Sequence, residues 1–438
     1  MNIDNLLKLP NVFVGGSEEN VVSLITTTGG SGQISPQAIG GQFSLAVRQG
    51  DHYYLIRDRL GINKLFYHLD PEGRTVTVGN YIHDVAAAVR DLNRIFSVPP
   101  GHFLKIDAAS GTHKLVSYYD ISETDSQPAE AFDPVAFRDR VHTALSRFFS
   151  QVKAQFPDSL FCVCLSGGLD SSLIASYASE YLDPVVATTF SYQSGPNGTV
   201  SEDFTAASAI AAHLGLRFEP ILAKKEIATE VLDTVLRYGQ DWRDFNVHCA
   251  WVNHLIGREM RRRFPLRRLV FLTGDLMNEF VADYTPVTYG GATYYPQPKI
   301  SKERLRRFFI YGLDTSDREI GIFHQWDITT LQPYSVVAEE YLGVPAEILN
   351  APHSKETLNL PLISNPKVQE SLTKTKVRAQ VGGSDGGTLG MFHDHDISQS
   401  ILKTRWEKLF LDMTANEAIK PMIISGRYRS DSSSQCAA

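Results

Sequence analysis

Hydrophobic and polar residues alternate with a period of two over much of the first 120 residues. Short apolar runs recur between turns rich in glycine, proline and aspartate, for example at residues 70–73 and 99–101. This alternation is typical of half-buried strands that are joined by tight turns. We therefore expect a β-rich, layered domain with strands at residues 43–47, 53–57, 65–68, 75–78 and 102–106.

The pattern changes after an acidic, proline-containing segment at residues 122–133, which we interpret as a linker. Apolar residues then recur at helical spacing across 134–155, which predicts an amphipathic helix. Apolar strand-like runs and helical stretches alternate beyond it. This order is typical of a parallel sheet that binds its ligand at the carboxyl ends of the strands. The predicted strands are 160–165, 185–191 and 269–273, and the predicted helices are 171–181 and 204–214.

The remaining residues are expected to be mostly helical from about residue 300, with a glycine-rich interruption at 382–390 and a flexible tail at 430–438. The expected fold class is α/β in two domains. A layered β-rich domain covers residues 1–121, and a parallel-sheet domain covers residues 134–429.

Composition narrows the classes of function. The chain has 438 residues, of which 43% are hydrophobic and 21% charged, and a net charge of −7, which describes a globular protein whose main partner is not nucleic acid. Its four cysteines form no disulfide framework. We find neither a signal peptide nor an apolar run long enough to cross a membrane, so a cytoplasmic location is expected.

Candidate chemistry lies in residues 165–172, where a predicted strand ends and a helix begins. Glycines allow a close approach of the backbone to phosphate, serine hydroxyls donate hydrogen bonds, and a helix N-terminus favours an anion. A carboxylate in such a loop is best used to hold Mg²⁺. The alternative is a plain turn that caps the helix. The candidate phosphate-binding residues are Leu165, Ser166, Gly167, Gly168, Asp170, Ser171 and Ser172.

This segment resembles the SGGxDS loop of the ATP-pyrophosphatase superfamily. The resemblance implies a PP-loop domain that uses ATP and Mg²⁺, cleaves ATP between its α and β phosphates, and adenylates a substrate. The loop alone leaves several branches open, namely NAD, GMP, argininosuccinate and asparagine synthetases and the tRNA-modifying members.

The N-terminal half resembles the glutaminase domain of asparagine synthetases at residues 41–46, 55–67 and 98–102, and residues 201–215 resemble their second synthetase helix. Those glutaminases need a cysteine directly after the initiator methionine as nucleophile. Here the residue is Asn2, and no cysteine precedes Cys162. We therefore expect a degenerate N-terminal-nucleophile (Ntn) glutaminase-like domain that serves as a scaffold.

The loss of this cysteine is shared with β-lactam and carbapenam synthetases, and their pattern is the closest. That resemblance implies adenylation of a carboxylate and attack by an amine of the same molecule, as in antibiotic biosynthesis. Lys376, followed by residues 382–388, looks like their lysine and glycine-rich loop. Lys376 would then contact the α-phosphate and the developing oxyanion, and the glycine-rich stretch would be a closing lid or a plain loop.

A second departure lies at residues 273–279. The family has Gly-x-Gly-x-Asp there, and its aspartate is a second Mg²⁺ ligand, whereas this chain has Asn278, which would coordinate more weakly. The expected metal ligands are Asp170, Asn278 and Glu279. Candidate general bases are Asp275, Asp317 and Glu319, although the last two also suit a solvated acidic turn. Further candidate ATP contacts are Tyr192, Thr273 and Gly274.

Three classes of function follow. The favoured hypothesis is an ATP-dependent C–N ligase acting on a small carboxylate and amine, by lactam closure or by intermolecular, ammonia-dependent amide formation. The second is a non-catalytic ATP-binding relic. The third, a tRNA-thiolating enzyme, is disfavoured by the acidic charge and by the absence of CxxC pairs. A homodimer without nucleic-acid or membrane partners is expected.

Overall fold

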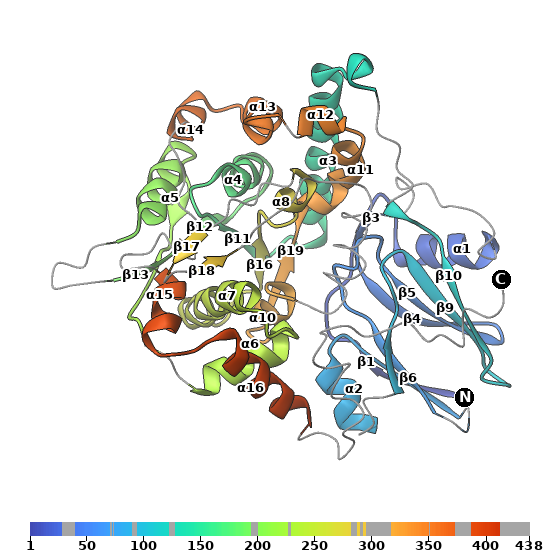
Figure 1. Cartoon of the computed structure of the whole chain (residues 1–438). Coiled ribbons are helices and arrows are strands. Elements are labelled where there is room, and N and C mark those ends of the chain that lie inside the picture. Colours follow the sequence, from blue (N-terminus) through green and yellow to red (C-terminus); the bar gives the residue numbers. More distant parts are fainter. Residues whose placement is uncertain are drawn as a thin grey trace.

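The computed structural model describes residues 1–28, 40–70, 72, 74–89, 94–121, 128–193, 200–226, 229–281, 287–289, 292–294, 317–349, 351–372 and 387–411. Within these residues the chain folds into a β-rich N-terminal domain and a larger domain built on a parallel sheet (Figure 1).

The N-terminal domain contains two four-stranded sheets that share one core. The residues between the sheets come from both of them and are fully buried, among them Leu55, Tyr67, Val76 and Leu104. One sheet has the order β1 (Asn2–Leu6), β7 (Thr75–Gly79), β6 (Phe66–Leu69) and β8 (Ile95–Ser97). The other has the order β10 (His113–Ser117), β9 (His102–Asp107), β5 (His52–Arg57) and β4 (Ser44–Gln49).

Two helices cover the outer faces of these sheets. Helix α1 (Glu18–Thr28) contributes Val21 and Ile25 to a core that includes Leu45 of β4. Helix α2 (Ile82–Val89) packs on β6 and β7. The predicted strands at residues 43–106 each overlap an observed strand, because every one of them has the period-two pattern of a sheet that is buried on at least one face.

The second domain is organised around a five-stranded sheet in which every neighbouring pair is parallel. In register, Val163 lies between Ala187 and Leu272. The strand order is β14 (Arg217–Phe218), β12 (Val185–Thr188), β11 (Leu160–Cys164), β16 (Leu269–Leu272) and β19 (Ile328–Leu331).

Both faces of this sheet are covered by helices. Phe161 and Val163 share a core with α3 (Pro134–Gln155) and α4 (Leu169–Tyr181). Cys162 shares a different core with α7 (Asp244–Arg263) and α10 (Ile320–His324), which lie on the other side of the sheet (Figure 1). Burial on both faces explains why the strand reads as one continuous apolar run.

Helix α3 has the bounds that helical spacing predicts. Its N-cap Asp133 accepts hydrogen bonds from the backbone N–H groups of Val135 and Ala136, and Pro134 occupies the first helical position. Both features favour a helix start at this point.

The remaining described elements surround the sheet. They are a small parallel pair, β13 (Phe190–Tyr192) and β15 (Ile221–Ala223), and two antiparallel pairs, β2 (Val12–Val14) with β3 (Gly40–Gln42) and β17 (Val287–Tyr289) with β18 (Ala292–Tyr294). The helices are α5 (Glu202–His213), α6 (Thr229–Gly239), α8 (Met277–Val281), α11 (Ala338–Leu342), α12 (Ala346–Leu349), α13 (Ser354–Asn359), α14 (Pro366–Ser371), α15 (Gly387–Asp394) and α16 (Gln399–Leu411).

Two expectations about local structure were wrong, and one strand was not predicted. The stretch 185–191 is two strands, β12 and β13, which pair with different neighbours. The described residues from 317 onward are mostly helical but also contain the unpredicted edge strand β19. Residues 387–390 of the glycine-rich segment begin helix α15, because Leu389, Met391 and Phe392 bury their side chains and Phe392 packs edge-on against Trp251.

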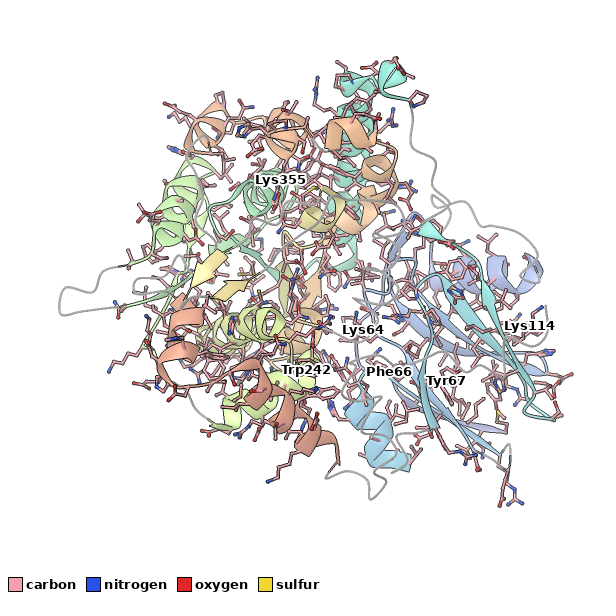
Figure 2. The ribbon with its side chains drawn as sticks, viewed as in Figure 1. Lys64, Phe66, Tyr67, Lys114, Trp242 and Lys355 are labelled. Carbon is pink, nitrogen blue, oxygen red and sulfur yellow. The ribbon has the colours of Figure 1, made fainter. Side chains whose placement is uncertain are left out.

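The two domains meet at the carboxyl end of β19. Gln42 of β3 is buried there, and its Nε2 donates to the carbonyl of Thr330 at 2.7 Å while its Oε1 accepts from the backbone N–H of Gln332 at 3.2 Å. Arg59 forms an ion pair with Glu339 across the same junction. Figure 2 shows Lys64 at this junction and Lys355 within the second domain. Among the described residues, the structure contains no helix that is long and apolar enough to cross a membrane.

Candidate active site

The candidate site lies where the order of the parallel sheet reverses. After β11 the chain continues to β12 on one side, whereas after β16 it continues to β19 on the other side. The loops that follow β11 and β16 therefore diverge and leave a crevice between them, the usual position for a ligand in such sheets. Gly274 lies against the first loop, since a Cβ added to it would be 2.9 Å from the backbone nitrogen of Ser171.

Residues 165–172 connect β11 to α4 as a tight loop, and two glycines make this geometry possible. Gly167 has a φ of +74°, and a Cβ there would lie 2.6 Å from the Cβ of Ala206 on α5. Gly168 is the N-cap of α4 and provides no side-chain cap. The first N–H groups of α4 are thus left to bond an anion, which the helix dipole also favours.

Serine hydroxyls hold the loop in this shape. The Oγ of Ser171 accepts from the backbone N–H of Ser166 at 3.1 Å and donates to the carbonyl of Gly168 at 3.2 Å. The Oγ of Ser172 donates to the same carbonyl at 2.7 Å. Ser171 and Ser172 are buried and Ser166 is half-buried, so Ser166 is the most accessible hydroxyl of the three.

A cavity of about 150 Å³ opens beside this loop. Tyr192 is one of its walls, and the Tyr192 hydroxyl lies 3.3 Å from Oγ1 of Thr388. Burial raises the pKa of Tyr192 to about 12, so its hydroxyl remains protonated. The lining residues combine apolar walls with hydroxyl, amide and carboxylate groups: Cys164, Leu165, Ser166, Thr188, Thr189, Phe190, Ser191, Tyr192, Ser201, Asp203, Val252, Asn253 and Ile256.

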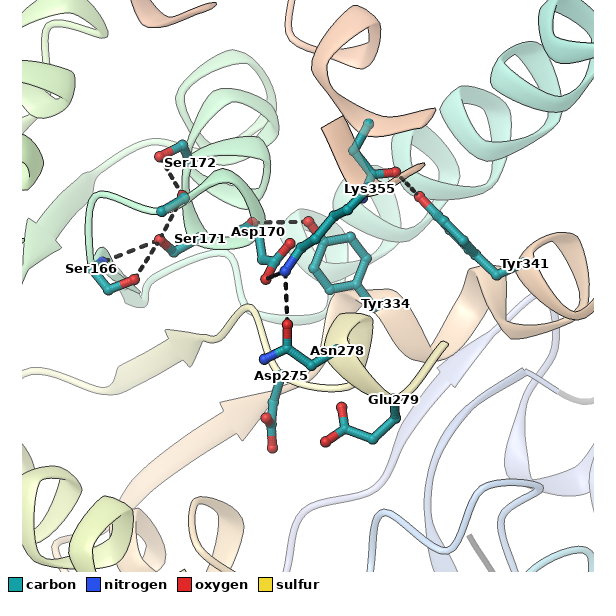
Figure 3. Close-up of polar contacts among 12 residues, drawn as sticks. Ser166, Asp170, Ser171, Ser172, Asp275, Asn278, Glu279, Tyr334, Tyr341 and Lys355 are labelled. Carbon is teal, nitrogen blue, oxygen red and sulfur yellow. Dashed lines mark hydrogen bonds and ion pairs between the residues drawn. The ribbon is translucent and has the colours of Figure 1, made fainter. Parts of the chain in front are cut away.

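Asp170 and Asn278 approach each other across the crevice, with a lysine between them (Figure 3). The Nζ of Lys355 lies 2.6 Å from Oδ2 of Asp170 and 2.7 Å from Oδ1 of Asn278. The other oxygen of Asp170, Oδ1, is buried and has no hydrogen-bond partner among the described residues. Tyr334 also holds the backbone of the loop, because its hydroxyl donates to the carbonyl of Asp170 at 2.8 Å.

A second cation, Arg318, neutralises the acids that follow β16. Its Nε lies 3.1 Å from Oδ2 of Asp275, and its Nη2 lies 3.4 Å from Oε1 of Glu279. The expected metal ligand Glu279 and the candidate base Asp275 therefore share one guanidinium group.

The candidate base Glu319 is held by neutral partners. Its Oε2 accepts from Oγ1 of Thr273 at 2.6 Å and from Nε2 of Gln332 at 3.1 Å. Burial, and then the negative charge of Asp275, raise the pKa of Glu319 to about 8. A carboxyl with this pKa exchanges protons near neutral pH, as a general acid or base requires.

Asp317 occupies a different environment. Its carboxylate accepts backbone N–H bonds from Gly321 at 2.8 Å and Glu319 at 3.2 Å, at the start of α10. Burial raises the pKa of Asp317, and the nearby Lys64 opposes that shift. Because both oxygens are engaged by the backbone, Asp317 organises the turn that carries Glu319.

The structure thus brings most of the predicted site residues together at one edge of the sheet: the loop 165–172, Tyr192, and residues 273–279 with Glu319. Lys376 lies outside the described residues. Sequence reasoning missed Lys355, Arg318 and Gln332, which come from segments without a recognisable motif. One feature of the sequence could have pointed to them. Asn278 is neutral where an acidic metal ligand was expected, so a positive side chain could take the place of the metal.

Other candidate groups are cysteine and histidine side chains. Cys162 and Cys164 are on β11, where Cys164 lines the cavity, and burial raises the pKa of both thiols. His393 and Asp394 end α15, and His395 contacts the carbonyl of Met391. Across the described ranges, no group of three or more histidine, cysteine, aspartate or glutamate side chains is arranged to hold a metal ion.

Comparison with known proteins gives one family match. The family model "Asparagine synthase" matches residues 148–314, which include the loop at 165–172. The chain is 25% identical over 268 residues to "Asparagine synthetase [glutamine-hydrolyzing] 2" of Oryza sativa subsp. japonica, covering 60% of this chain and 41% of that protein. It is 24% identical over 331 residues to "Asparagine synthetase [glutamine-hydrolyzing] 1" of Lotus japonicus, covering 73% and 50%.

Likeness to solved structures is weaker. NMN synthetase from Francisella tularensis aligns with a TM-score of 0.24 and 15% identity over 62% of this chain and 96% of that chain. The U34-tRNA thiolase NcsA from Methanococcus maripaludis aligns with a TM-score of 0.29 and 13% identity, over 57% and 85%. The chain spans about half or less of the length of the plant asparagine synthetases. Residues 148–314, which lie in the second domain, are thus similar to the asparagine synthase family model.

Proposed function

We propose that this chain is an ATP-dependent amide-forming ligase that activates a substrate carboxylate as its adenylate and releases pyrophosphate. The observation that carries this proposal is the loop at 165–172, which stands at the reversal point of the sheet beside a cavity. Open helix N–H groups and an accessible serine hydroxyl at that point suit a polyphosphate.

The nucleotide would bind with its phosphates on the loop and its base in the cavity. The apolar walls, such as Ile256 and Phe190, suit a planar ring, and Tyr192 remains a hydrogen-bond donor. Asp170 would hold Mg²⁺, because its buried Oδ1 has no hydrogen-bond partner among the described residues. When bound there, the ion supplies positive charge that neutralises the phosphates.

In the first step, an oxygen of the substrate carboxylate attacks the α-phosphorus and the bond to pyrophosphate breaks. Negative charge develops on the phosphate oxygens, and fixed cations stabilise it strongly in a site that excludes water. In the described part of the chain, Lys355 and the first N–H groups of α4 are charged and polar groups that lie at the loop. Lys376 remains our proposed contact to the α-phosphate.

In the second step, an amine attacks the acyl carbonyl, and AMP leaves. The attacking nitrogen must lose a proton, and Glu319 is the base we propose, because Asp275 is tied to Arg318 and Asp317 to the backbone. Residues 1–121 contain no cysteine, so this domain has no thiol that could attack glutamine. We therefore propose that the amine belongs to the substrate itself and that the product is a lactam.

Pyrophosphate release tests this function. Purified protein with ATP and Mg²⁺ should form AMP and pyrophosphate in equal amounts with one member of a panel of amino-acid-derived carboxylates that carry an internal amine. Ser166→Ala should reduce this rate, and Ser179→Ala, a serine on the far end of α4, should not. If ATP binds and no carboxylate in the panel yields pyrophosphate, the chain is an ATP-binding relic and the proposal is wrong.

A further inference from the structure

The ammonium group of Lys355 occupies the space between two oxygens that the sequence pattern assigns to a metal ion. It lies 2.6 Å from Oδ2 of Asp170 and 2.7 Å from Oδ1 of Asn278, at normal distances for charge-assisted hydrogen bonds (Figure 3). Its side chain is 11% exposed, and the side chain of Asp170 is 17% exposed. The contact is therefore part of the crevice wall.

This arrangement does not fit a divalent ion that bridges Asp170 and Asn278. Mg²⁺ prefers charged or hydrated oxygen ligands at about 2.0–2.1 Å and keeps much of its water, and an ammonium in the same space would repel it. An amide oxygen is a weak metal ligand and a good acceptor for an ammonium. Asn278 thus suits Lys355 better than it suits a metal.

The neighbouring acids do not supply a replacement ligand pair. Asp275 and Glu279 both face Arg318, at 3.1 Å and 3.4 Å. Asp170 still offers Oδ1, which is buried and has no hydrogen-bond partner among the described residues. Asp170 therefore keeps one oxygen for a divalent ion, whereas Asn278 faces Lys355 and Glu279 faces Arg318.

We propose that Lys355 serves as a built-in cation at a second metal position, so that this chain binds its nucleotide with one divalent ion. Asn278 and Lys355 act together, because the neutral amide accepts the ammonium without adding a charge that would attract a second metal. This inference rests on the proposed function, since it requires that a nucleotide binds at the loop.

The test counts metal ions directly. Mn²⁺ is titrated into the protein with saturating α,β-methylene-ATP, and bound ions are counted by electron paramagnetic resonance. The wild-type chain should hold one Mn²⁺. The double variant Asn278→Asp with Lys355→Met, which removes the ammonium and turns the amide into a carboxylate, should hold two.

Single substitutions separate charge from folding. Lys355→Met should weaken binding of the nucleotide analogue by about 10-fold or more, because it leaves the charge of Asp170 uncompensated beside the phosphates. Lys355→Arg keeps the charge and should retain most of the affinity. Lys153→Met, an exposed lysine of α3, is the matched control and should bind as the wild type does. Circular dichroism melting establishes that each variant is folded.

Two different failures are distinguishable. If the wild-type chain binds the analogue with two Mn²⁺ ions, or if Lys355→Met binds as tightly as the wild type, the lysine does not replace a metal, and the proposed function is unaffected. If the analogue does not bind the wild-type chain at all, both proposals are wrong.

Discussion

The two domains both bury charged side chains, but they use different partners. In the N-terminal domain, Arg57 is fully buried and donates to the carbonyls of Asn63, Val98 and Gly61 at 2.8–3.0 Å. Asp58 next to it accepts four backbone N–H bonds. In the second domain, Lys355 and Arg318 bond to side chains at the mouth of a crevice. A charged side chain that hydrogen-bonds to the backbone fixes the shape of a turn. A charged side chain that bonds to another side chain in a crevice can give up that partner and bind a ligand instead.

This difference explains the role of residues 55–67, which carry part of the resemblance to glutaminase domains. Their polar side chains hold one turn between β5 and β6, where the side chains of Arg57 and Asp58 hydrogen-bond to backbone groups. The motif at 55–67 therefore indicates how the domain folds and does not indicate whether the domain has glutaminase activity.

The largest expected effect is on the stability of the N-terminal domain. Arg57→Met removes a donor from three buried carbonyls, of which that of Gly61 keeps Lys64 as a donor, and leaves Asp58 without its neighbouring charge. We therefore expect the free energy of unfolding to fall by about 3–5 kcal/mol. Urea unfolding measures this change. Arg74→Met, at a side chain that is 79% exposed, should change it by less than about 0.5 kcal/mol. A loss below about 1 kcal/mol for Arg57→Met would contradict the structural role.

The next effect is on catalysis in the second domain. Glu319→Gln should lower the rate of amide formation by about 100-fold or more, because the proton of the attacking amine loses its acceptor. Folding should change little, since an amide resembles the protonated carboxyl that Glu319 has at pH 7. Single-turnover kinetics with the adenylated substrate measure the rate, and Glu347→Gln, at an exposed position, is the control. An unchanged rate would remove Glu319 as the base.

A pH profile gives a smaller and more specific effect. The pKa of Glu319 is raised to about 8, so the active, deprotonated form grows as pH rises. The rate should increase about 10-fold from pH 6 to pH 7 and level off above pH 8. Because Asp275 contributes to the shift, Asp275→Asn should move the profile to lower pH. A flat profile between pH 6 and pH 8 in the wild-type enzyme would argue against this assignment.

The smallest effect comes from a matched pair of buried tyrosines. Tyr118 donates to the carbonyl of Arg57 at 2.6 Å, and Tyr334 donates to the carbonyl of Asp170 at 2.8 Å. Each change to phenylalanine should cost about 1 kcal/mol of unfolding free energy. Only Tyr334→Phe should also weaken binding of α,β-methylene-ATP, as measured by calorimetry. If both variants weaken it equally, the contrast between the two domains does not hold.

Sequence patterns predicted the elements in which local physics is decisive. The period-two strands of the first domain and helix α3, with its Asp133 cap and Pro134, follow from neighbouring residues. The loop after β11 was predictable because its glycines and serines form a contiguous motif. Helix α15 was missed because its formation depends on burial against Trp251, a contact far away in the sequence.

The same reasoning explains why sequence patterns did not identify part of the candidate site. Lys355 lies in an ordinary polar helix, α13, and contacts Asp170, which stands 185 positions earlier in the chain. Glu319 belonged to an acidic turn that also suits a solvated surface, and the roles of Glu319 and Asp317 differ only through their partners. Side-chain pairing across the crevice has no periodicity, so sequence alone does not reveal it.

Gln42 gives the first domain a structural role that does not depend on any catalytic activity of that domain. Its side chain closes the end of β19, where Gln332 in turn bonds to Glu319. Removing the domain would leave the carbonyl of Thr330 and the N–H of Gln332 without these partners. The second domain therefore depends on the fold of the first domain, because the first domain completes the hydrogen bonds at this end of the sheet.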